Sequence, residues 1–284
     1  MAAIMLTACH LSHPSDSKDY VFTDGYGRDV TVPASPTRIV STSPAVTEII
    51  YALGAEELLV GRTDFCTYPP EAQNIESIGG ISNLNVEKVM SLKPDLIISG
   101  SMIPRKITTQ LEQMGVPTAC VIEQSHFDGL YDNIRKIGRL TGRQHAADSL
   151  VEKLQAICPA ADARQPGISD NVPTVYYVVG FGSAGNFTAG GNSFINDIIS
   201  LAGGRNIAAD VTGWSYSLET LLTEAPDYIV IRKEDSAAFC NMAPYNRLAA
   251  VKANRVIGIE SGMIDLQVPR NIDAIRLIRK RITD

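Results

Sequence analysis

The sequence predicts an α/β fold of two related, Rossmann-like lobes joined by a single long rigid α-helix. Short β-branched runs alternate with helix-like stretches from Arg38 onward, which is the pattern of parallel α/β units. A segment of the first half returns in the second half, and a long stretch between the halves has helical periodicity with no strand signal. Together these observations favour two lobes and a stiff connector.

The expected strands are short and apolar throughout, as is typical of parallel sheets covered by helices on both faces. In chain order they are 38–41, 59–61, 96–99, 118–121, 174–179, 228–231 and 256–259. The helices expected between the first strands are 45–53, 85–92 and 105–114. Gly54 and Gly115 stand just past helix ends, where a left-handed cap favours glycine.

An internal repeat supports two related lobes rather than one long sheet. Residues 85–98 return as 217–230, with glutamate, proline and aspartate at identical spacing. In each copy a capping residue begins a short helix, Pro-Asp ends it and an apolar strand follows. Likewise, Glu-Ile-Ile at 48–50 is echoed by Asp-Ile-Ile at 197–199.

The stretch 129–161 predicts the connector, because leucine and isoleucine recur there at helical spacing and only Gly138 and Gly142 interrupt it. A polar loop then leads into the second half. The expected organisation is an N-terminal remnant and tether (1–20), an N-terminal lobe (21–125), a connecting helix region (126–165) and a C-terminal lobe (166–284).

Composition excludes several classes of protein. The 284 residues are 45% apolar and 20% charged, which rules out disorder, and a net charge of −6 argues against a nucleic-acid surface. No run of 18 apolar residues predicts a membrane-spanning helix. Four histidines, two of them in the N-terminal tail, are too few for a bare zinc or manganese receptor, so we expect neither a metal site nor a cofactor.

The N-terminal sequence predicts a lipid-attachment site. Leu6-Thr7-Ala8-Cys9 resembles the lipobox of bacterial lipoproteins, in which the cysteine is acylated, although no basic residue precedes it. The alternative is a disordered tail with an incidental cysteine. The other cysteines are Cys66, Cys120, Cys158 and Cys240. They have no C-x-x-C spacing and predict no zinc site, but the sequence allows one disulfide bond among them.

Loop aromatics point to a ligand. They follow expected strands or precede the second repeat helix, in three pairs: Phe65 and Tyr68, Phe181 and Phe187, Trp214 and Tyr216. Ligands of open α/β sheets bind beyond the carboxyl ends of the strands, where such side chains suit a large, flat, partly apolar molecule. The alternative for each single residue is ordinary packing within a lobe.

The motifs support an enzymatic function less well than a ligand-binding function. The loop Gly180–Gly185 matches the dinucleotide fingerprint, but no helix is expected to open within it. There is no G-x-S-x-G, and His126 and His145 belong to no recognisable motif, so we expect no catalytic residues. A nucleotide-dependent α/β enzyme that uses this glycine loop stays open as the alternative from a different class.

Several motifs follow one another along the chain: residues 37–48, 60–72, 79–80, 85–95, 187–193 and Pro269-Arg270. In this order they resemble the periplasmic binding proteins of cobalamin, siderophore and haem ABC importers, with the cobalamin receptors most similar, and the likeness covers roughly residues 22–282. The resemblance implies two α/β lobes on one long helix, with the ligand held in the cleft between them. It also implies a monomer in the periplasm or at the cell surface, anchored through Cys9, with a permease dimer and its ATPase as partners.

The resemblance further implies roles for individual residues. Phe65, Phe181, Phe187 and Trp214 would line a corrinoid cleft, and Glu87 and Glu219 would dock onto permease arginines. A haem receptor would instead need an axial ligand, for which Tyr68 or Tyr216 could serve. A ferric-siderophore receptor would need basic cleft residues, for which Arg62 or Arg270 could serve.

Overall fold

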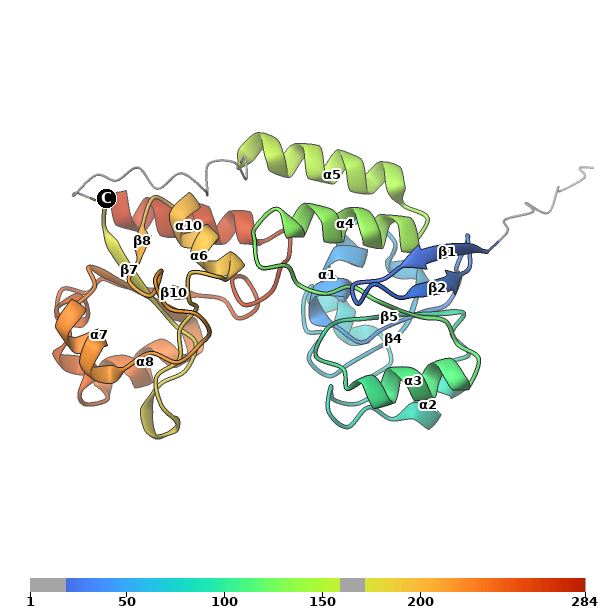
Figure 1. Ribbon diagram of the computed structural model, residues 1–284, viewed down its shortest axis with the longest axis horizontal. Helices are drawn as coiled ribbons and strands as arrows, with labels where there is room; N and C mark the ends of the chain where they lie inside the picture. Colours follow the sequence, from blue (N-terminus) through green and yellow to red (C-terminus); the bar gives the residue numbers. More distant parts are fainter. Residues whose placement is uncertain (1–18, 159–171, 284) are drawn as a thin grey trace, which may run out of the picture.

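A computed structural model describes residues 19–158 and 172–283 and confirms two α/β lobes, each built on a parallel four-stranded sheet (Figure 1). The N-terminal sheet has the order β4-β3-β5-β6, and the C-terminal sheet has the order β8-β7-β9-β10. Counted within each lobe, both orders are second, first, third, fourth, so the lobes share one topology. Their bounds are β3 (Ile39–Ser41), β4 (Leu59–Arg62), β5 (Leu96–Ser99), β6 (Thr118–Cys120), β7 (Thr174–Val178), β8 (Arg205–Asn206), β9 (Tyr228–Arg232) and β10 (Val256–Ile259).

Helices flank both sheets. The N-terminal lobe has α1 (Pro44–Ala52), α2 (Val86–Ser91) and α3 (Arg105–Gln113), and the C-terminal lobe has α6 (Phe194–Leu201), α7 (Leu218–Glu224), α8 (Lys233–Asn241), α9 (Ala249–Lys252) and α10 (Asn271–Thr283). Short 3-10 turns occupy Glu56–Leu58, Pro70–Asn74, Gly182–Ala184 and Tyr245–Arg247. The largest cluster of buried apolar side chains runs from α1 through the connecting helices into α6 and α10, so the two lobes share one core. No helix in the described ranges is long and apolar enough to cross a membrane.

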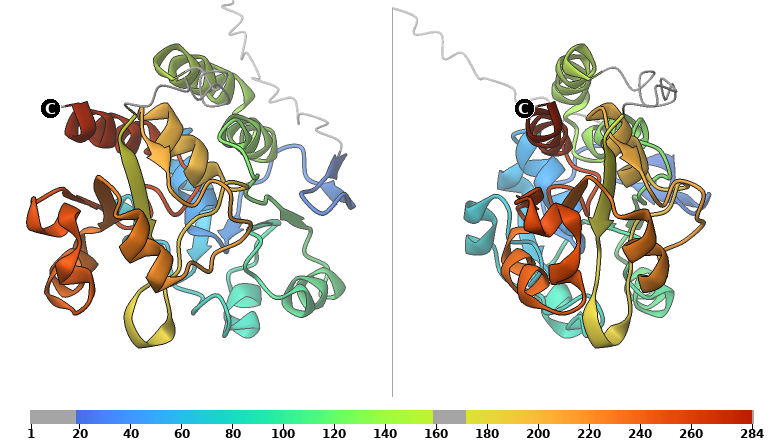
Figure 2. Two further views of the ribbon diagram at one scale, coloured as in Figure 1. Left: turned by 60° about the vertical axis from the view of Figure 1, so that its left-hand side comes forward. Right: turned by 90° about the vertical axis from the view of Figure 1, so that its left-hand side faces the viewer.

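The expectation of a single long connecting helix is wrong. The structure has two helices, α4 (Gly129–Leu140) and α5 (Gln144–Ile157), folded back on each other as a hairpin (Figures 1 and 2). Gly142 has a φ of +69°, which favours glycine and turns the chain between them. Gly138 lets the helices approach closely, because a Cβ at this position would lie 2.4 Å from the Cβ of Ala147. The domain limits given above stay a prediction.

The repeated Pro-Asp pair has the same structural task in both lobes. Asp95 accepts hydrogen bonds from the backbone N–H (2.7 Å) and hydroxyl (2.8 Å) of Thr37, just before β3. Asp227 accepts the same two bonds from Thr174, at the start of β7, at 2.8 and 2.7 Å. Each aspartate therefore fastens the beginning of the third strand of its lobe to the first.

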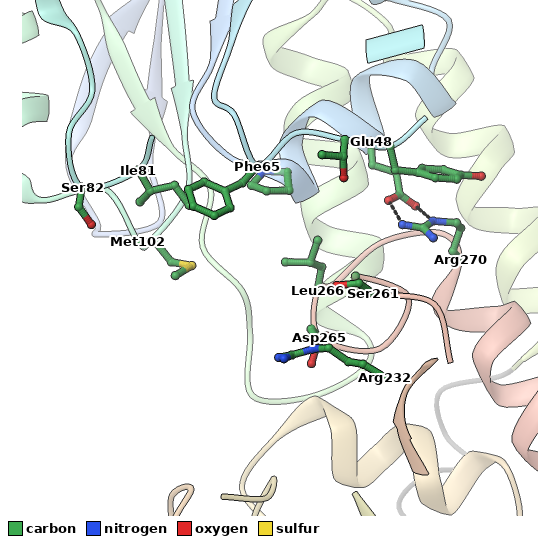
Figure 3. Close-up of a pocket in the computed structure, with 14 residues that line it drawn as sticks. Glu48, Phe65, Ile81, Ser82, Met102, Arg232, Ser261, Asp265, Leu266 and Arg270 are labelled. Atoms are coloured by element: carbon green, nitrogen blue, oxygen red, sulfur yellow. Dashed lines mark hydrogen bonds and ion pairs between the residues drawn. The ribbon is translucent and has the colours of Figure 1, made fainter. Parts of the chain in front are cut away.

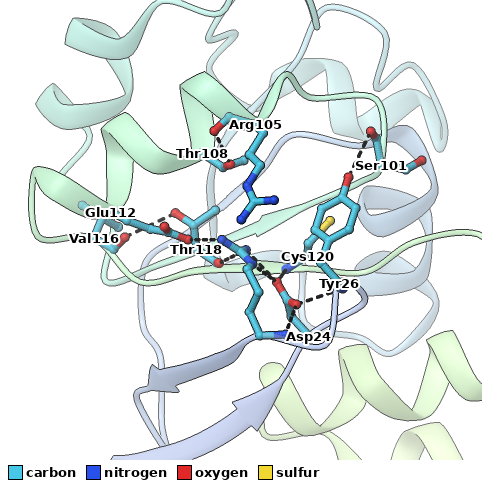
Figure 4. A network of polar contacts seen from close by, with 10 residues as sticks. Asp24, Tyr26, Ser101, Arg105, Thr108, Glu112, Val116, Thr118 and Cys120 are labelled. Atoms are coloured by element: carbon cyan, nitrogen blue, oxygen red, sulfur yellow. Dashed lines mark hydrogen bonds and ion pairs between the residues drawn. The ribbon is translucent and has the colours of Figure 1, made fainter.

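An N-terminal hairpin, β1 (Tyr20–Thr23) and β2 (Asp29–Val32), was not expected from the sequence. The Arg28 guanidinium contacts Asp24 in the turn of the hairpin at 2.6 Å, and it ties the hairpin to the N-terminal lobe through Glu112 of α3 at 2.8 Å. Asp24 also accepts a 3.3 Å hydrogen bond from the backbone N–H of Cys120 in β6 (Figure 4). A polar network thus attaches the hairpin to the edge of the sheet.

Stability should depend on pH through this network. Burial alone would raise the pKa of Asp24, but hydrogen bonds from Arg28 and from the Tyr26 backbone lower it below its ordinary value. A lowered folded-state pKa gives stability that is present above the unfolded-state pKa, near 3.9, and is lost as the pH falls through the folded value. We expect Asp24→Asn to lower the free energy of unfolding by about 1–3 kcal/mol at pH 7, and by clearly less at pH 3.

Urea denaturation of both proteins at the two pH values measures this difference. Asp29→Asn is the matched control, because Asp29 lies on the same hairpin but is exposed, and it should change little at either pH. A difference for Asp24→Asn that is the same at pH 7 and pH 3 would contradict the prediction.

Candidate functional site

A cavity of about 460 Å³ lies between the lobes, beyond the carboxyl ends of several strands (Figure 3). The N-terminal lobe contributes Pro44, Glu48, Phe65, Thr67, Tyr68, Ile81, Ser82 and Met102, and the C-terminal lobe contributes Arg232, Ser261, Gly262, Asp265, Leu266 and Arg270. These residues come from α1, from loops after β4 and β5, from the last residue of β9 and from the segment after β10. Open α/β sheets bind their ligands at this position. We call this cavity the interlobe cleft.

The N-terminal wall of the interlobe cleft presents large apolar side chains to solvent. Met102 is 69% exposed, Phe65 is 59% exposed and Tyr68 is 40% exposed. Side chains of this kind are usually buried, and a group of them in one cavity marks a surface that a ligand can cover. Burial of a flat apolar molecule against this wall would remove both surfaces from water.

A buried ion pair joins the two lobes at one end of the cleft. The Arg270 Nε and Nη2 atoms lie 2.8 and 2.9 Å from the two carboxylate oxygens of Glu48, and both residues are buried (Figure 3). Burial raises the pKa of the Glu48 carboxyl, and the hydrogen bonds from Arg270 oppose that rise. Burial alone would lower the pKa of Arg270, but Glu48 raises it, so the guanidinium stays charged. The face of the guanidinium also stacks on Tyr68, with Cζ 3.5 Å from the ring centroid.

A second ion pair lies on the C-terminal wall. Arg232 Nε donates a 3.0 Å hydrogen bond to Asp265, and the two side chains lie side by side in Figure 3. The Tyr177 hydroxyl donates to the other oxygen of Asp265. Burial, together with the charge of Asp265, raises the pKa of Tyr177 well above its ordinary value, so the phenol remains a donor. Each of the two arginines that line the cleft is therefore paired with a carboxylate, and the lining carries no net charge.

The structure brings only some of the expected ligand residues together. Phe65, Tyr68 and Arg270 all line the interlobe cleft. Phe187 and Trp214, which are 36% and 50% exposed, lie on neighbouring C-terminal segments joined by a 2.8 Å hydrogen bond from the Thr188 N–H to the Trp214 carbonyl. They are not among the residues that line the cavity.

Two of the expected aromatics belong to the C-terminal core instead. Phe181 packs edge to face against Phe239 and Tyr245, at centroid distances of 5.2 and 5.7 Å. Tyr216 is buried against Tyr176 at 5.5 Å. Both side chains therefore have partners in the C-terminal lobe and do not line the cavity.

Sequence reasoning missed the charged lining residues Glu48, Arg232 and Asp265, and also Met102. The echo of 48–50 by 197–199 singled out Glu48 only as part of a repeat. Arg62, suggested as a basic cleft residue, instead donates hydrogen bonds to the carbonyls of Thr63, Ala72 and Gln73 at 3.0–3.2 Å. Its guanidinium is thereby committed to the loop after β4.

Glu87 and Glu219 occupy equivalent exposed positions in the two lobes. Each lies in the first turn of its helix, after a cap whose side chain accepts a backbone hydrogen bond: Asn85 in α2 and Ser217 in α7. Within the described chain neither carboxylate forms an ion pair. Cys9 lies outside the described residues.

The other candidates for chemistry are the glycine loop, a metal site and the cysteines. The Gly180–Gly185 loop contains one 3-10 turn, and the next helix, α6, begins only at Phe194, so no helix opens within the glycine motif. Within 19–158 and 172–283, no three His, Cys, Asp or Glu side chains are grouped to hold a metal ion. Cys66, Cys120 and Cys240 are thiols in the structure.

Comparisons with known proteins agree with this architecture. A family model described as periplasmic binding protein matches residues 39–262. The chain is 30% identical to an uncharacterized ABC transporter substrate-binding lipoprotein, YvrC, of Bacillus subtilis (strain 168), over 99% of this chain and 94% of that protein. It is 31% identical to a cobalamin-binding protein of Halobacterium salinarum, over 88% of this chain and 70% of that protein.

Two solved structures are similar at 25% sequence identity. One is the periplasmic vitamin B12 binding protein BtuF of Vibrio cholerae, with a TM-score of 0.72 over 87% of this chain and 97% of that one. The other is the periplasmic heme-binding protein BhuT in complex with two hemes, with a TM-score of 0.76 over 88% and 98%.

Proposed function

This chain belongs to the periplasmic binding protein family, and on that premise we propose that it captures cobalamin or a related corrinoid and delivers it to an ABC importer. The ligand would lie in the interlobe cleft. Delivery would require a permease dimer with its ATPase, onto which Glu87 and Glu219 dock. The named relatives support this proposal, because one is a cobalamin-binding protein and another a substrate-binding lipoprotein of an ABC transporter.

The observation that carries the ligand assignment is a cleft with exposed apolar side chains and no unpaired charge. Arg232 and Arg270 are both committed to carboxylates, so among the described residues the lining has no free cation for an acidic ligand. A corrinoid is a large flat macrocycle whose rim carries neutral amides, which suits apolar burial with hydrogen bonds at the edge. We propose Phe65 and Tyr68 as direct contacts and Arg270 as a lining residue that acts through the Tyr68 ring, with Phe187 and Trp214 reached by a ligand that extends beyond the cavity. Phe181 and Tyr216 would act only through the packing of the C-terminal lobe.

Haem is the second candidate, because Tyr68 places a phenol at the cleft where an axial iron ligand would be needed. The two propionates of haem, however, would need cationic side chains as partners. The arginines of the lining are already paired with Glu48 and Asp265. A ferric siderophore has the same difficulty, since Arg62 is held by backbone carbonyls.

A nucleotide-dependent enzyme would use the Gly180–Gly185 loop, which lacks the helix N-terminus that a pyrophosphate needs.

The remaining parts of the proposal concern the setting. The protein would act outside the cytoplasm as a monomer, held to a membrane through acylated Cys9, and would perform no catalysis. Two acyl chains anchor a protein stably, whereas one does not. Loss of palmitate labelling in Cys9→Ala would support this anchor. Labelling that persists in Cys9→Ala would exclude this attachment site.

Titration of the purified chain with cyanocobalamin, haemin and a ferric siderophore tests the ligand assignment. We expect saturable binding of cyanocobalamin, measured by calorimetry, at least tenfold tighter than that of haemin or of the siderophore, because the latter two carry uncompensated anionic groups. Tighter binding of haemin would transfer the assignment to the second candidate. Binding of a nucleotide and of none of the three would overturn the receptor function.

A further inference from the structure

Three side chains that line the cleft form a cluster in which a residue of the C-terminal lobe contacts two residues of the N-terminal lobe. Glu48 lies on α1 of the N-terminal lobe, Arg270 immediately precedes α10 of the C-terminal lobe, and Tyr68 lies in the N-terminal loop after β4. The edge of the Arg270 guanidinium donates to the two Glu48 oxygens at 2.8 and 2.9 Å, and its face lies 3.5 Å from the Tyr68 ring centroid. An aromatic of one lobe is thus held by a cation of the other.

The position of Arg270 is fixed by its own lobe. The neighbouring Asn271 is fully buried, and its side-chain oxygen accepts a 2.9 Å hydrogen bond from the Val268 N–H. Its side-chain nitrogen donates to the carbonyls of Met263 (2.9 Å) and Leu266 (2.8 Å). These bonds hold the segment before α10, so the guanidinium has a rigid base on the C-terminal side.

The Tyr68 side chain, in contrast, is held less firmly than the backbone of its loop. Hydrogen bonds such as that from the Cys66 N–H to the Thr63 carbonyl (3.0 Å) hold the loop before the 3-10 turn at Pro70, but the Tyr68 side chain is 40% exposed. Within the part of the chain that is described, its hydroxyl has no hydrogen-bond partner. The stacked guanidinium is therefore the specific contact that orients the ring, and Glu48 in turn orients the guanidinium.

The other half of the molecule offers a natural comparison. Asp197 of α6 is the counterpart of Glu48 in the internal echo, and it accepts a 2.9 Å hydrogen bond from the Phe127 N–H and lies 3.4 Å from His126 Nδ1. It holds the segment before α4 as Glu48 holds the segment before α10. No residue of this second contact lines the cavity. Support of the junction alone therefore does not account for the stacking on Tyr68.

We propose that Glu48 and Arg270 are positioning residues for ligand binding, which hold the Tyr68 ring in its binding orientation in the cleft wall before the ligand arrives. The proposal rests on the cleft being the ligand site. Because the ring is already ordered, binding does not have to immobilise it. Less of the favourable contact free energy is therefore offset by lost side-chain entropy, and the affinity is higher.

A paired apolar replacement separates positioning from mere stability. Removing one partner of a buried ion pair is strongly destabilising, whereas replacing both by apolar residues of similar size is often neutral. We therefore expect Glu48→Met/Arg270→Met to keep a melting temperature near that of the wild type but to bind cyanocobalamin about tenfold more weakly. Tyr68→Ala should weaken binding similarly, and its addition to the Met pair should cost little more, because all three changes act through one ring.

Arg270→Lys is a second variant that does not depend on the Met pair folding. A lysine keeps the charge opposite Glu48 but lacks the planar group that stacks on Tyr68, so affinity should again fall. Asp197→Asn is the matched control, and it should lower the melting temperature while leaving affinity within about twofold. Full affinity in both the Met pair and Arg270→Lys would overturn the positioning role.

A ligand-free readout keeps this test separate from the identity of the ligand. Hydrogen exchange of the loop 64–70, followed by mass spectrometry, should be faster in the Met pair than in the wild type and unchanged in Asp197→Asn. If the wild type binds no corrinoid, the proposed function fails, while faster exchange would still support the positioning of Tyr68. Unchanged exchange in the Met pair would overturn it whatever the ligand is.

Discussion

Replacing Glu87 and Glu219 together by alanine is expected to reduce importer-dependent uptake to background while ligand affinity stays within about twofold of the wild type. Both carboxylates are exposed, and they occupy the same position of the internal repeat, one in each lobe. Two equivalent charges suit a permease built from two equivalent subunits. Neither residue lines the interlobe cleft, so ligand capture should be unaffected.

The measurement is uptake of labelled cyanocobalamin by cells that carry the matching importer, beside calorimetry on the purified variant. Glu56→Ala/Glu234→Ala is the matched control, because it also removes one exposed first-turn acid from each lobe and shifts the net charge from −6 to −4. The control should transport normally. Equal loss of uptake in both pairs would show an effect of total charge, and a collapse of affinity would assign Glu87 and Glu219 to the fold or the cleft.

Most of the fold could be predicted because its signals are local. Every expected strand has a counterpart whose ends differ by no more than one residue, since buried parallel strands are continuous apolar runs in the sequence. The connector failed because apolar spacing continues through both α4 and α5, which bury faces on each other and on the core. The sequence signal for the break between the two helices is Gly142, where the chain turns. The hairpin of β1 and β2 was missed because long-range contacts through Arg28 hold it.

The cleft could be predicted only in part, because the direction of a loop aromatic depends on distant partners. Phe65 and Phe181 both follow strands in glycine-containing segments, yet only Phe65 faces the cleft. Phe181 is drawn into the core by Phe239 and Tyr245, which come from later elements of the same lobe. The Glu48–Arg270 pair joins residues 222 positions apart, and no spacing rule connects them. Sequence reasoning therefore locates the edge of the sheet where a ligand binds more reliably than it identifies the side chains that face it.

Replacing Phe65 by alanine is expected to weaken cyanocobalamin binding about 10- to 100-fold, because burial of an aromatic ring contributes about 1.5–3 kcal/mol. Phe65 is 59% exposed in the free protein, so the ring has apolar surface left to bury when a ligand arrives. For the same reason the variant should keep its melting temperature. Calorimetric titration and thermal unfolding of the same preparation measure both effects.

Tyr26→Ala is the control for this substitution, since Tyr26 is a 50% exposed aromatic of the same lobe that does not line the cavity. It should bind as the wild type does. Trp214→Ala, on the C-terminal lobe, then locates the ligand. Weakening in both Phe65→Ala and Trp214→Ala would mean that the ligand extends from the cavity to the C-terminal rim. Normal binding in Phe65→Ala with loss in Trp214→Ala would move the site out of the interlobe cleft, because the ligand would then be held by one lobe alone.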